Sequence, residues 1–134
     1  MSSSALALLG LVSWTMLLLL MLGGYRGALV LSGKRAANQF NPDGSDVSPF
    51  SNRLCRAHAN CYENLPLFAA VILLAMVMGR GGVTDPLALW LLGARVGQSA
   101  IHLVSTSHYA VLIRFALFLS QWGIVAYWVY RLVG

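Results

Sequence analysis

The sequence has little charge of either sign, and acidic residues are the scarcest. Its 134 residues include 4 Asp or Glu and 9 Lys or Arg, so charged residues make up 10% of the chain against 58% for hydrophobic ones. A soluble globule needs more polar side chains than this to cover its surface, and a mean hydropathy of +0.71 indicates that much of the chain faces lipid. The length allows for one domain. The composition therefore predicts a single-domain membrane protein.

Cysteine and recognisable metal-ligand spacings are also scarce. The two cysteines, Cys55 and Cys61, would point about 120° apart on a helix, which is too divergent for a disulfide within the chain. We interpret both as small apolar filler residues. No CxxC or Cys/His spacing supports a metal site. Nucleic-acid binding is also disfavoured, because hydrophobic segments separate the basic residues and no basic run is interleaved with exposed aromatics.

Long apolar segments dominate what is present. The first contains "ALALLGLVSWTMLLLLMLGG", which matches the roughly 20 residues needed to cross a bilayer. A signal peptide is the alternative, disfavoured by the lack of a basic n-region and of a small-x-small cleavage site. We expect helices at about 5–35, 51–79, 86–105 and 109–133, with a polar linker at 36–50. These segments predict an all-α integral membrane protein, residues 1–134, folded as a four-helix transmembrane bundle.

The distribution of basic residues predicts the orientation in the membrane. Four of them flank the polar linker: Lys34, Arg35, Arg53 and Arg56. The opposite side carries Arg80, offset by Asp85, and Arg131. By the positive-inside rule the linker lies in the cytoplasm and both termini lie outside. We expect a multi-pass protein of a bacterial inner membrane or the endoplasmic reticulum, with its functional site facing the cytoplasm.

Polar residues of the second predicted helix gather on one face. Arg53, Asn60 and Glu63 all fall within about 60° of Arg56 on a helical wheel. His58 lies on the opposite side and does not belong to this cluster. The purely apolar part of the helix is too short to span a bilayer alone, so the polar part must occupy the edge of the membrane.

The third and fourth helices carry polar residues at a similar depth. One face of the third helix holds four of them: Arg95, Gln98, Ser99 and His102. At ~1.5 Å per residue, Glu63, His102 and Arg114 lie about 24 to 27 Å from the outer helix ends, and Arg95 about 14 Å. A charge within a spanning segment costs at least ~2.5–3.5 kcal/mol on insertion scales. We therefore expect Arg95 to reach Glu63, directly or through Gln98 or water. The alternative is that Arg95 has only a structural role, in an ion pair that holds the helices together.

Together these residues predict a polar pocket rich in guanidinium groups. Arginine forks bind carboxylates with two hydrogen bonds, and a glutamate accepts from an ammonium group. An arginine in a low dielectric also lowers the pKa of a nearby thiol, because the thiolate gains a charge partner. A ligand with two carboxylates, one ammonium and one thiol would satisfy every group. Glutathione is such a ligand.

The stretch "RLCRAHANCYENLP" resembles the RxxRAxxNxxExxP signature of the MAPEG family, the membrane-associated proteins in eicosanoid and glutathione metabolism. The positions that match are Arg53, Arg56, Ala57, Asn60, Glu63 and Pro66. The segments "SGKRAANQFNP", "ARVGQSAIH" and "VLIRFALF" are similar to the end of the family's first helix, its third helix and its fourth-helix arginine. The resemblance covers nearly the whole chain. It implies a homotrimer of four-helix subunits with glutathione sites at the subunit interfaces.

The resemblance also implies roles for individual residues. Arg114 would be the catalytic residue that stabilises the thiolate, and Arg35 would sit at the mouth of the site. His102 stands where many relatives have a tyrosine, and Tyr109 is a candidate for the missing hydroxyl. The residues expected to bind glutathione are Arg35, Arg53, Arg56, Asn60, Glu63, Arg95, Gln98, His102 and Tyr109. No metal is expected.

Three functions fit these expectations. The first is a membrane-bound glutathione transferase or peroxidase that uses glutathione as cosubstrate against lipophilic electrophiles or lipid hydroperoxides taken from the bilayer. The second is a small proton-coupled multidrug transporter, although the first helix lacks an acid and Glu63 has several cationic neighbours. The third is a non-catalytic lipid-binding or glutathione-binding member of the same fold. The expected partners are glutathione, a lipophilic small molecule, membrane lipid and further copies of the chain, without nucleic acid.

Overall fold

The computed structural model describes all residues from Met1 to Gly134 as helices and connecting segments, with no strands. The long helices are α1 (Ser3–Leu31), α2 (Pro49–Val77), α3 (Asp85–Val104) and α4 (His108–Val133), and a short 3-10 turn, η1 (Gly81–Val83), joins α2 to α3. Each of the four is long and apolar enough to cross a membrane. The prediction of an all-α protein with four membrane-spanning helices is confirmed.

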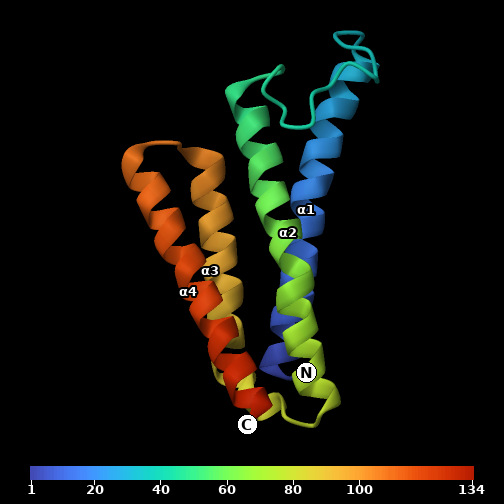
Figure 1. Cartoon of the computed structure of the whole chain (residues 1–134). Coiled ribbons are helices and arrows are strands. Elements are labelled where there is room, and N and C mark those ends of the chain that lie inside the picture. Colours follow the sequence, from blue (N-terminus) through green and yellow to red (C-terminus); the bar gives the residue numbers. More distant parts are fainter.

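The four helices run alternately up and down, so both termini lie at the end opposite the long linker (Figure 1). The α1–α2 pair extends beyond the α3–α4 hairpin on the linker side (Figure 1). The third helix packs against the other three, whereas α4 packs mainly on α3 and contacts α2 less. The α4 helix therefore has a smaller interface with α2 than with α3.

The first helix ends at Leu31, before the predicted boundary at residue 35, because Gly33 adopts a left-handed conformation with a φ of +75°. The N–H of Lys34 donates to the carbonyl of Leu29 at 3.0 Å, the hydrogen bond over five residues that is typical of a glycine-terminated helix. Arg35 therefore lies in the linker, outside the helix.

The second helix begins at Pro49, slightly earlier than predicted. The side chain of Ser48 accepts a hydrogen bond from the N–H of Ser51 at 3.0 Å and so caps the first turn. Proline is favoured at the first helical position because its missing N–H would have no partner there. The Ser48-Pro49 pair thus fixes where the linker stops.

Two apolar clusters hold the bundle together. All four helices contribute to the larger one, which consists of Ala7, Leu11, Phe68, Ile72, Ala88, Leu91, Val125 and Trp128. The smaller one belongs to α1 and α2 and consists of Leu18, Leu22, Leu54, Cys55 and Cys61, with Leu103 of α3 packed against it. No residue of α4 belongs to the smaller cluster. The α4 helix is therefore anchored to the whole bundle mainly by the larger cluster.

A buried polar contact fixes the start of α1 to the start of α3. The N–H of Ser4 donates to Oδ1 of Asp85 at 2.9 Å, and its hydroxyl donates to the same oxygen at 2.6 Å. The Ser4 hydroxyl also lies 2.6 Å from the hydroxyl of Thr84. Because the first N–H groups of a helix have no partner within it, Asp85 acts as a cap supplied by another helix.

Candidate functional site

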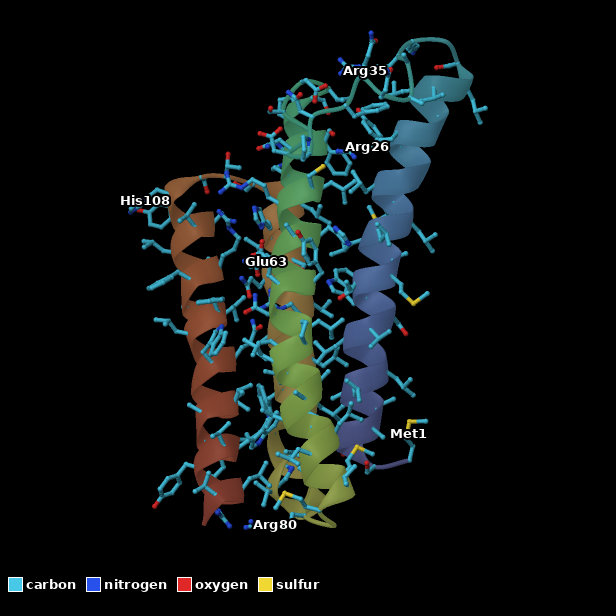
Figure 2. The ribbon with its side chains drawn as sticks, turned by 45° about the vertical axis from the view of Figure 1, so that its right-hand side comes forward. Met1, Arg26, Arg35, Glu63, Arg80 and His108 are labelled. Carbon is cyan, nitrogen blue, oxygen red and sulfur yellow. The ribbon has the colours of Figure 1, made fainter.

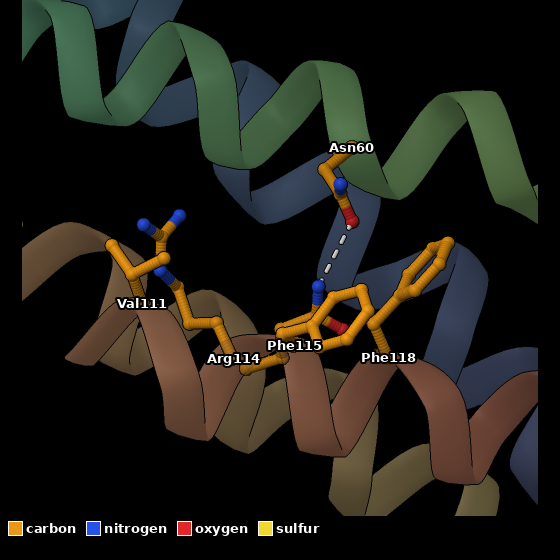
Figure 3. Close-up of a pocket in the computed structure, with 6 residues that line it drawn as sticks. Asn60, Val111, Arg114, Phe115 and Phe118 are labelled. Atoms are coloured by element: carbon orange, nitrogen blue, oxygen red, sulfur yellow. Dashed lines mark hydrogen bonds between the residues drawn. The ribbon is translucent and has the colours of Figure 1, made fainter. Parts of the chain in front are cut away.

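A polar cavity of about 250 Å³ lies among α2, α3 and α4 (Figure 3). Its lining consists of Asn60 from α2, Gln98 from α3, and Val111, Arg114, Phe115 and Phe118 from α4. Three of these residues, Asn60, Gln98 and Arg114, belong to the set predicted from the sequence. The fold thus brings polar groups from three helices to one place, beside aromatic rings that supply an apolar wall.

The side chain of Asn60 is held from two directions. Its Oδ1 accepts a hydrogen bond from Nε2 of Gln98 at 3.3 Å and a second, short one from Nη1 of Arg95. Figure 3 shows the bond to Gln98 crossing from α2 to α3. The amide nitrogen of Asn60 makes no hydrogen bond within the chain. Asn60 therefore presents an unused donor at the cavity.

Arg95 makes no hydrogen bond or ion pair with Glu63, and Gln98 does not bond Glu63 either, so the expected contact is wrong both as a direct one and as one through Gln98. Glu63 lies about 60° further round α2 than Asn60, on the exposed side, whereas Asn60 faces α3. The guanidinium of Arg95 is instead buried with 3% exposure, and its carbon lies 5.7 Å from the ring centroid of Phe68. Its Nε and Nη2 atoms have no hydrogen-bond partner. The charge of Arg95 has no carboxylate partner in the chain.

Arg114 extends from α4 into the space between α4 and α2 (Figure 3). His102 of α3 is buried, and neither Arg56 nor Arg114 forms an ion pair within the chain. The only ion pair in the chain, between Arg35 and Asp46, lies elsewhere. The mouth of the cavity is a region of uncompensated positive charge that favours anionic ligands.

Glu63 and Arg56 lie on the exposed face of α2. Figure 2 places Glu63 well within the length of the helix, away from both ends. Its carboxylate makes no hydrogen bond or ion pair with any residue of the chain. An ionised group at such a position is costly when it faces lipid, so residues of this kind normally face protein or a polar cavity.

The structure does not bring Arg35 to the cavity. Arg35 pairs with the carboxylate of Asp46, and its Nη2 donates to the carbonyl of Asp46 at 2.8 Å. Its Nη1 donates to the carbonyl of Gln39 at 3.1 Å, and its guanidinium lies over the ring of Phe40. Figure 2 shows Arg35 in the linker, far along the molecule from Glu63. Within its own chain Arg35 holds the linker in shape.

Two further predicted site residues lie outside the cavity lining. Nε of Arg53 donates to the carbonyl of Leu103 at 2.8 Å, which ties α2 to the last turn of α3. Tyr109 is 76% exposed in the first turn of α4, and its hydroxyl makes no hydrogen bond in the chain. A tyrosine hydroxyl is therefore absent from the cavity of the single chain.

The two cysteines are free and buried, but Cys61 is more than an apolar filler. Its thiol shares a hydrogen bond of 3.1 Å with the hydroxyl of Ser99. Cys55 lies 3.5 Å from Nη2 of Arg26, a residue that the sequence analysis did not single out. Arg26 also donates to the carbonyl of Asn41 at 3.0 Å and so ties the linker to α1.

A second residue that the sequence analysis missed is Gln121 of α4. It is fully buried, and its Nε2 donates to Oε1 of Gln98 at 2.8 Å. The signal that could have found it is a primary amide inside an otherwise apolar helix, where an unbonded polar group is expensive. Gln121 extends the polar site behind the cavity.

A larger, apolar groove of about 660 Å³ runs between α3 and α4, lined by residues within 87–94 and 117–124. It shares no lining residue with the polar cavity, because it lies on another face of α4. The groove is therefore separate from the polar site.

Taken together, these features define an integral, multi-pass membrane protein with four spanning helices and a cavity among the last three of them that is lined by Arg114, two amide side chains and apolar residues. The sequence matches the MAPEG family over residues 4–134, essentially the entire chain, and the chain belongs to that family. No curated protein and no solved structure matches it. The family resemblance seen in the sequence is confirmed.

Proposed function

We propose that the chain is a membrane-bound glutathione transferase that activates glutathione as a thiolate for attack on lipophilic electrophiles, with peroxidase activity toward lipid hydroperoxides. The family includes enzymes of glutathione and eicosanoid metabolism, which supplies the reaction class. The observation that carries the proposal is the cavity itself, in which Asn60, Gln98 and Arg114 meet without a carboxylate to neutralise the arginine.

In this proposal Arg114 acts by electrostatics. A guanidinium stays protonated in proteins and so cannot take the thiol proton, which leaves to water. The positive charges of Arg114 and Arg56 would favour the thiolate over the thiol and so lower the pKa of the bound sulfur. The aromatic wall of Phe115 and Phe118 excludes water from one side, which strengthens these interactions.

Two reactions follow from such a thiolate. With an electrophile, the sulfur forms a new bond to carbon and the leaving group departs with its electron pair. With a lipid hydroperoxide, the sulfur attacks the terminal oxygen, the O–O bond breaks, and the lipid leaves as an alkoxide that takes a proton from water. The resulting sulfenic acid of glutathione then condenses with a second glutathione to give the disulfide and water.

The polar face of α2 is the proposed binding site for the rest of the tripeptide. Arg56 offers a forked donor for a carboxylate, Asn60 offers its unused amide donor, and Glu63 offers an acceptor for the ammonium group. Arg56 and Glu63 are exposed in the single chain, and Glu63 is unpaired there. These groups are therefore available for a ligand.

The proposed assembly is a homotrimer in which a neighbouring subunit closes the site. An exposed and unpaired carboxylate within a spanning helix requires a protein or ligand partner. Arg35 lies in the linker beyond the end of α1, far along the molecule from Glu63, so its proposed place at the mouth is in the site of a neighbouring subunit (Figure 2). The proposed orientation places the linker and the site on the cytoplasmic side.

The decisive experiment is Arg114→Ala in detergent-purified protein. We expect the wild type to develop the ultraviolet absorbance of a thiolate when glutathione is added. The variant should still bind glutathione but lose that absorbance, because the thiolate has lost its charge partner. Arg131→Ala is the matched control, since Arg131 is an exposed arginine on the same helix that lies outside the cavity. An undiminished thiolate signal in Arg114→Ala would contradict the assignment.

A glutathione-binding protein without catalysis is the second candidate. It is favoured by one observation, the exposure of Tyr109, which leaves the cavity without a tyrosine hydroxyl. Binding of glutathione without a thiolate signal, and without turnover over a panel of electrophiles and hydroperoxides, would favour this candidate over the enzyme.

A further inference from the structure

Three hydrogen-bonded amide side chains cross the bundle, two of which line the cavity while the third, Gln121, lies behind it. Nε2 of Gln121 on α4 donates to Oε1 of Gln98 on α3 at 2.8 Å, and Nε2 of Gln98 donates to Oδ1 of Asn60 on α2 at 3.3 Å. Gln121 is 0% exposed and Gln98 is 5% exposed. Both hydrogen bonds run in the same direction, with the donor on the side of α4 and the acceptor on the side of α2.

This arrangement is poorly explained as a device for stability alone. Burying an amide in an apolar bundle is costly unless both of its ends are hydrogen-bonded. Oε1 of Gln121 is buried without a partner, so the residue is only partly satisfied. Its Nε2 is fully used, because it also donates to the carbonyl of Leu117 at 3.0 Å. The well-bonded group of Gln121 is therefore Nε2, which donates to Gln98.

The bond from Gln121 decides how Gln98 is turned. Since Oε1 of Gln98 must face the Gln121 donor, Nε2 of Gln98 faces the other way, toward Asn60. Asn60 then receives two donors at its Oδ1, one from Gln98 and one from Arg95. With its oxygen saturated, Asn60 can offer only its amide nitrogen to a ligand in the cavity that it lines.

We propose that Gln121 and Gln98 are positioning residues that turn the amide of Asn60 so that its N–H donors face the ligand. The group recognised is then an acceptor of the glutathione peptide, a carbonyl or carboxylate oxygen. The inference rests on the proposed glutathione site. It assigns to α4 a second task besides carrying Arg114, that of setting the orientation of a binding residue on α2.

The test is the glutathione affinity of Gln121→Met, which keeps the size of the side chain and removes its amide. We expect the dissociation constant to rise about tenfold, the factor for one hydrogen bond of ordinary strength. The same factor should apply to S-hexylglutathione, because the peptide and not the sulfur is affected. The thiolate absorbance at saturating glutathione should stay unchanged, since Arg114 is intact. Ser120→Ala, an exposed neighbour that bonds only within α4, is the control and should bind as the wild type does.

Coupling between the two glutamines separates positioning from simple packing. If Gln121 acts through Gln98, the double variant Gln121→Met with Gln98→Met should bind glutathione no more weakly than Gln98→Met alone. Should Gln121→Met fail to fold, Gln121→Asn is the second variant, because it keeps an amide but is too short to reach Gln98. Wild-type affinity in a folded Gln121 variant, or fully additive losses in the double variant, would overturn the inference while leaving the proposed function intact. Absence of glutathione binding by the wild type would overturn both.

Discussion

Arg95 places a positive charge inside the bundle with no carboxylate to neutralise it. The only hydrogen bond that its guanidinium donates goes to the amide oxygen of Asn60, and the other two of its three nitrogens lack a hydrogen bond. A buried charge that is incompletely hydrogen-bonded costs stability. Replacing such a charged side chain by an apolar one of similar size is often neutral or stabilising. The residue therefore fits a functional requirement better than a structural one, because it fixes the group that lines the cavity.

This account predicts opposite effects of Arg95→Met on binding and on stability. The apolar and flexible methionine fills the space beside Phe68 without a charge. The melting temperature in detergent should be unchanged or higher, whereas the dissociation constant for glutathione should rise about tenfold because Asn60 loses one of its two anchors. Thermal unfolding and titration calorimetry on the same preparation measure both. A large fall in melting temperature with unaltered affinity would make Arg95 a purely structural residue.

At the scale of elements, the linker between α1 and α2 is a folded structure with its own contacts. Arg35 bonds Asp46 within the linker, and Arg26 of α1 donates to the carbonyl of Asn41. Nδ2 of Asn52 of α2 donates to the carbonyl of Asp43 at 2.8 Å. Gly44 is buried against α2 with a φ of +69°. The linker is thus packed onto the start of α2, directly before the polar face of that helix.

Two glycines of similar conformation allow this packing to be tested. A Cβ on Gly44 would lie 2.6 Å from Oγ of Ser51 and 2.8 Å from Sγ of Cys55, whereas a Cβ on Gly33 would meet nothing within 4 Å. Both Gly→Ala changes cost about 1 kcal/mol for the left-handed backbone. Only Gly44→Ala adds a steric cost, typically about 1–3 kcal/mol. We expect Gly44→Ala to melt earlier and to be cut faster by protease in the linker than Gly33→Ala; equal behaviour would contradict close packing.

The helices themselves could be predicted from hydropathy because each apolar run is long enough to span a bilayer. Their ends were less predictable, since they depend on local backbone chemistry that hydropathy ignores. Gly33 stops α1 before the basic residues that follow, and Ser48 with Pro49 starts α2 within the turn-rich linker. In both cases the determining residue is visible in the sequence once capping is considered.

The candidate site was predictable in part, and the reason lies in helix rotation. Helical spacing correctly grouped Arg56, Asn60 and Glu63 on one side of α2, but it could not say which of them faces α3. That choice depends on how α2 is turned against its neighbours, and the structure directs Asn60 rather than Glu63 toward Arg95. Gln121 escaped notice because its role appears only when its partner Gln98 is known.

For the whole molecule, the central question is which chain supplies each part of the site. The cavity of a single chain already contains Asn60 and Arg114, from α2 and α4. If the protein is a homotrimer, each site should therefore take these two residues from the same subunit. In the proposed trimer, the neighbouring subunit covers Glu63 and Arg56, which are exposed in the single chain.

Mixed assemblies of two defective chains test this arrangement. Cells that co-express Asn60→Ala and Arg114→Ala chains under separate affinity tags would yield trimers containing both, isolated by two successive purifications. Because every chain then carries one defect in its own cavity, transferase activity should remain at the level of the separate variants. If the two residues came from different subunits, one of the three sites in every mixed trimer, about a third of all sites, would be intact and activity would recover. Recovery of activity would show that one site takes Asn60 and Arg114 from two subunits. Absence of recovery, with native mass spectrometry confirming that mixed trimers are present, would show that each site takes both residues from one subunit.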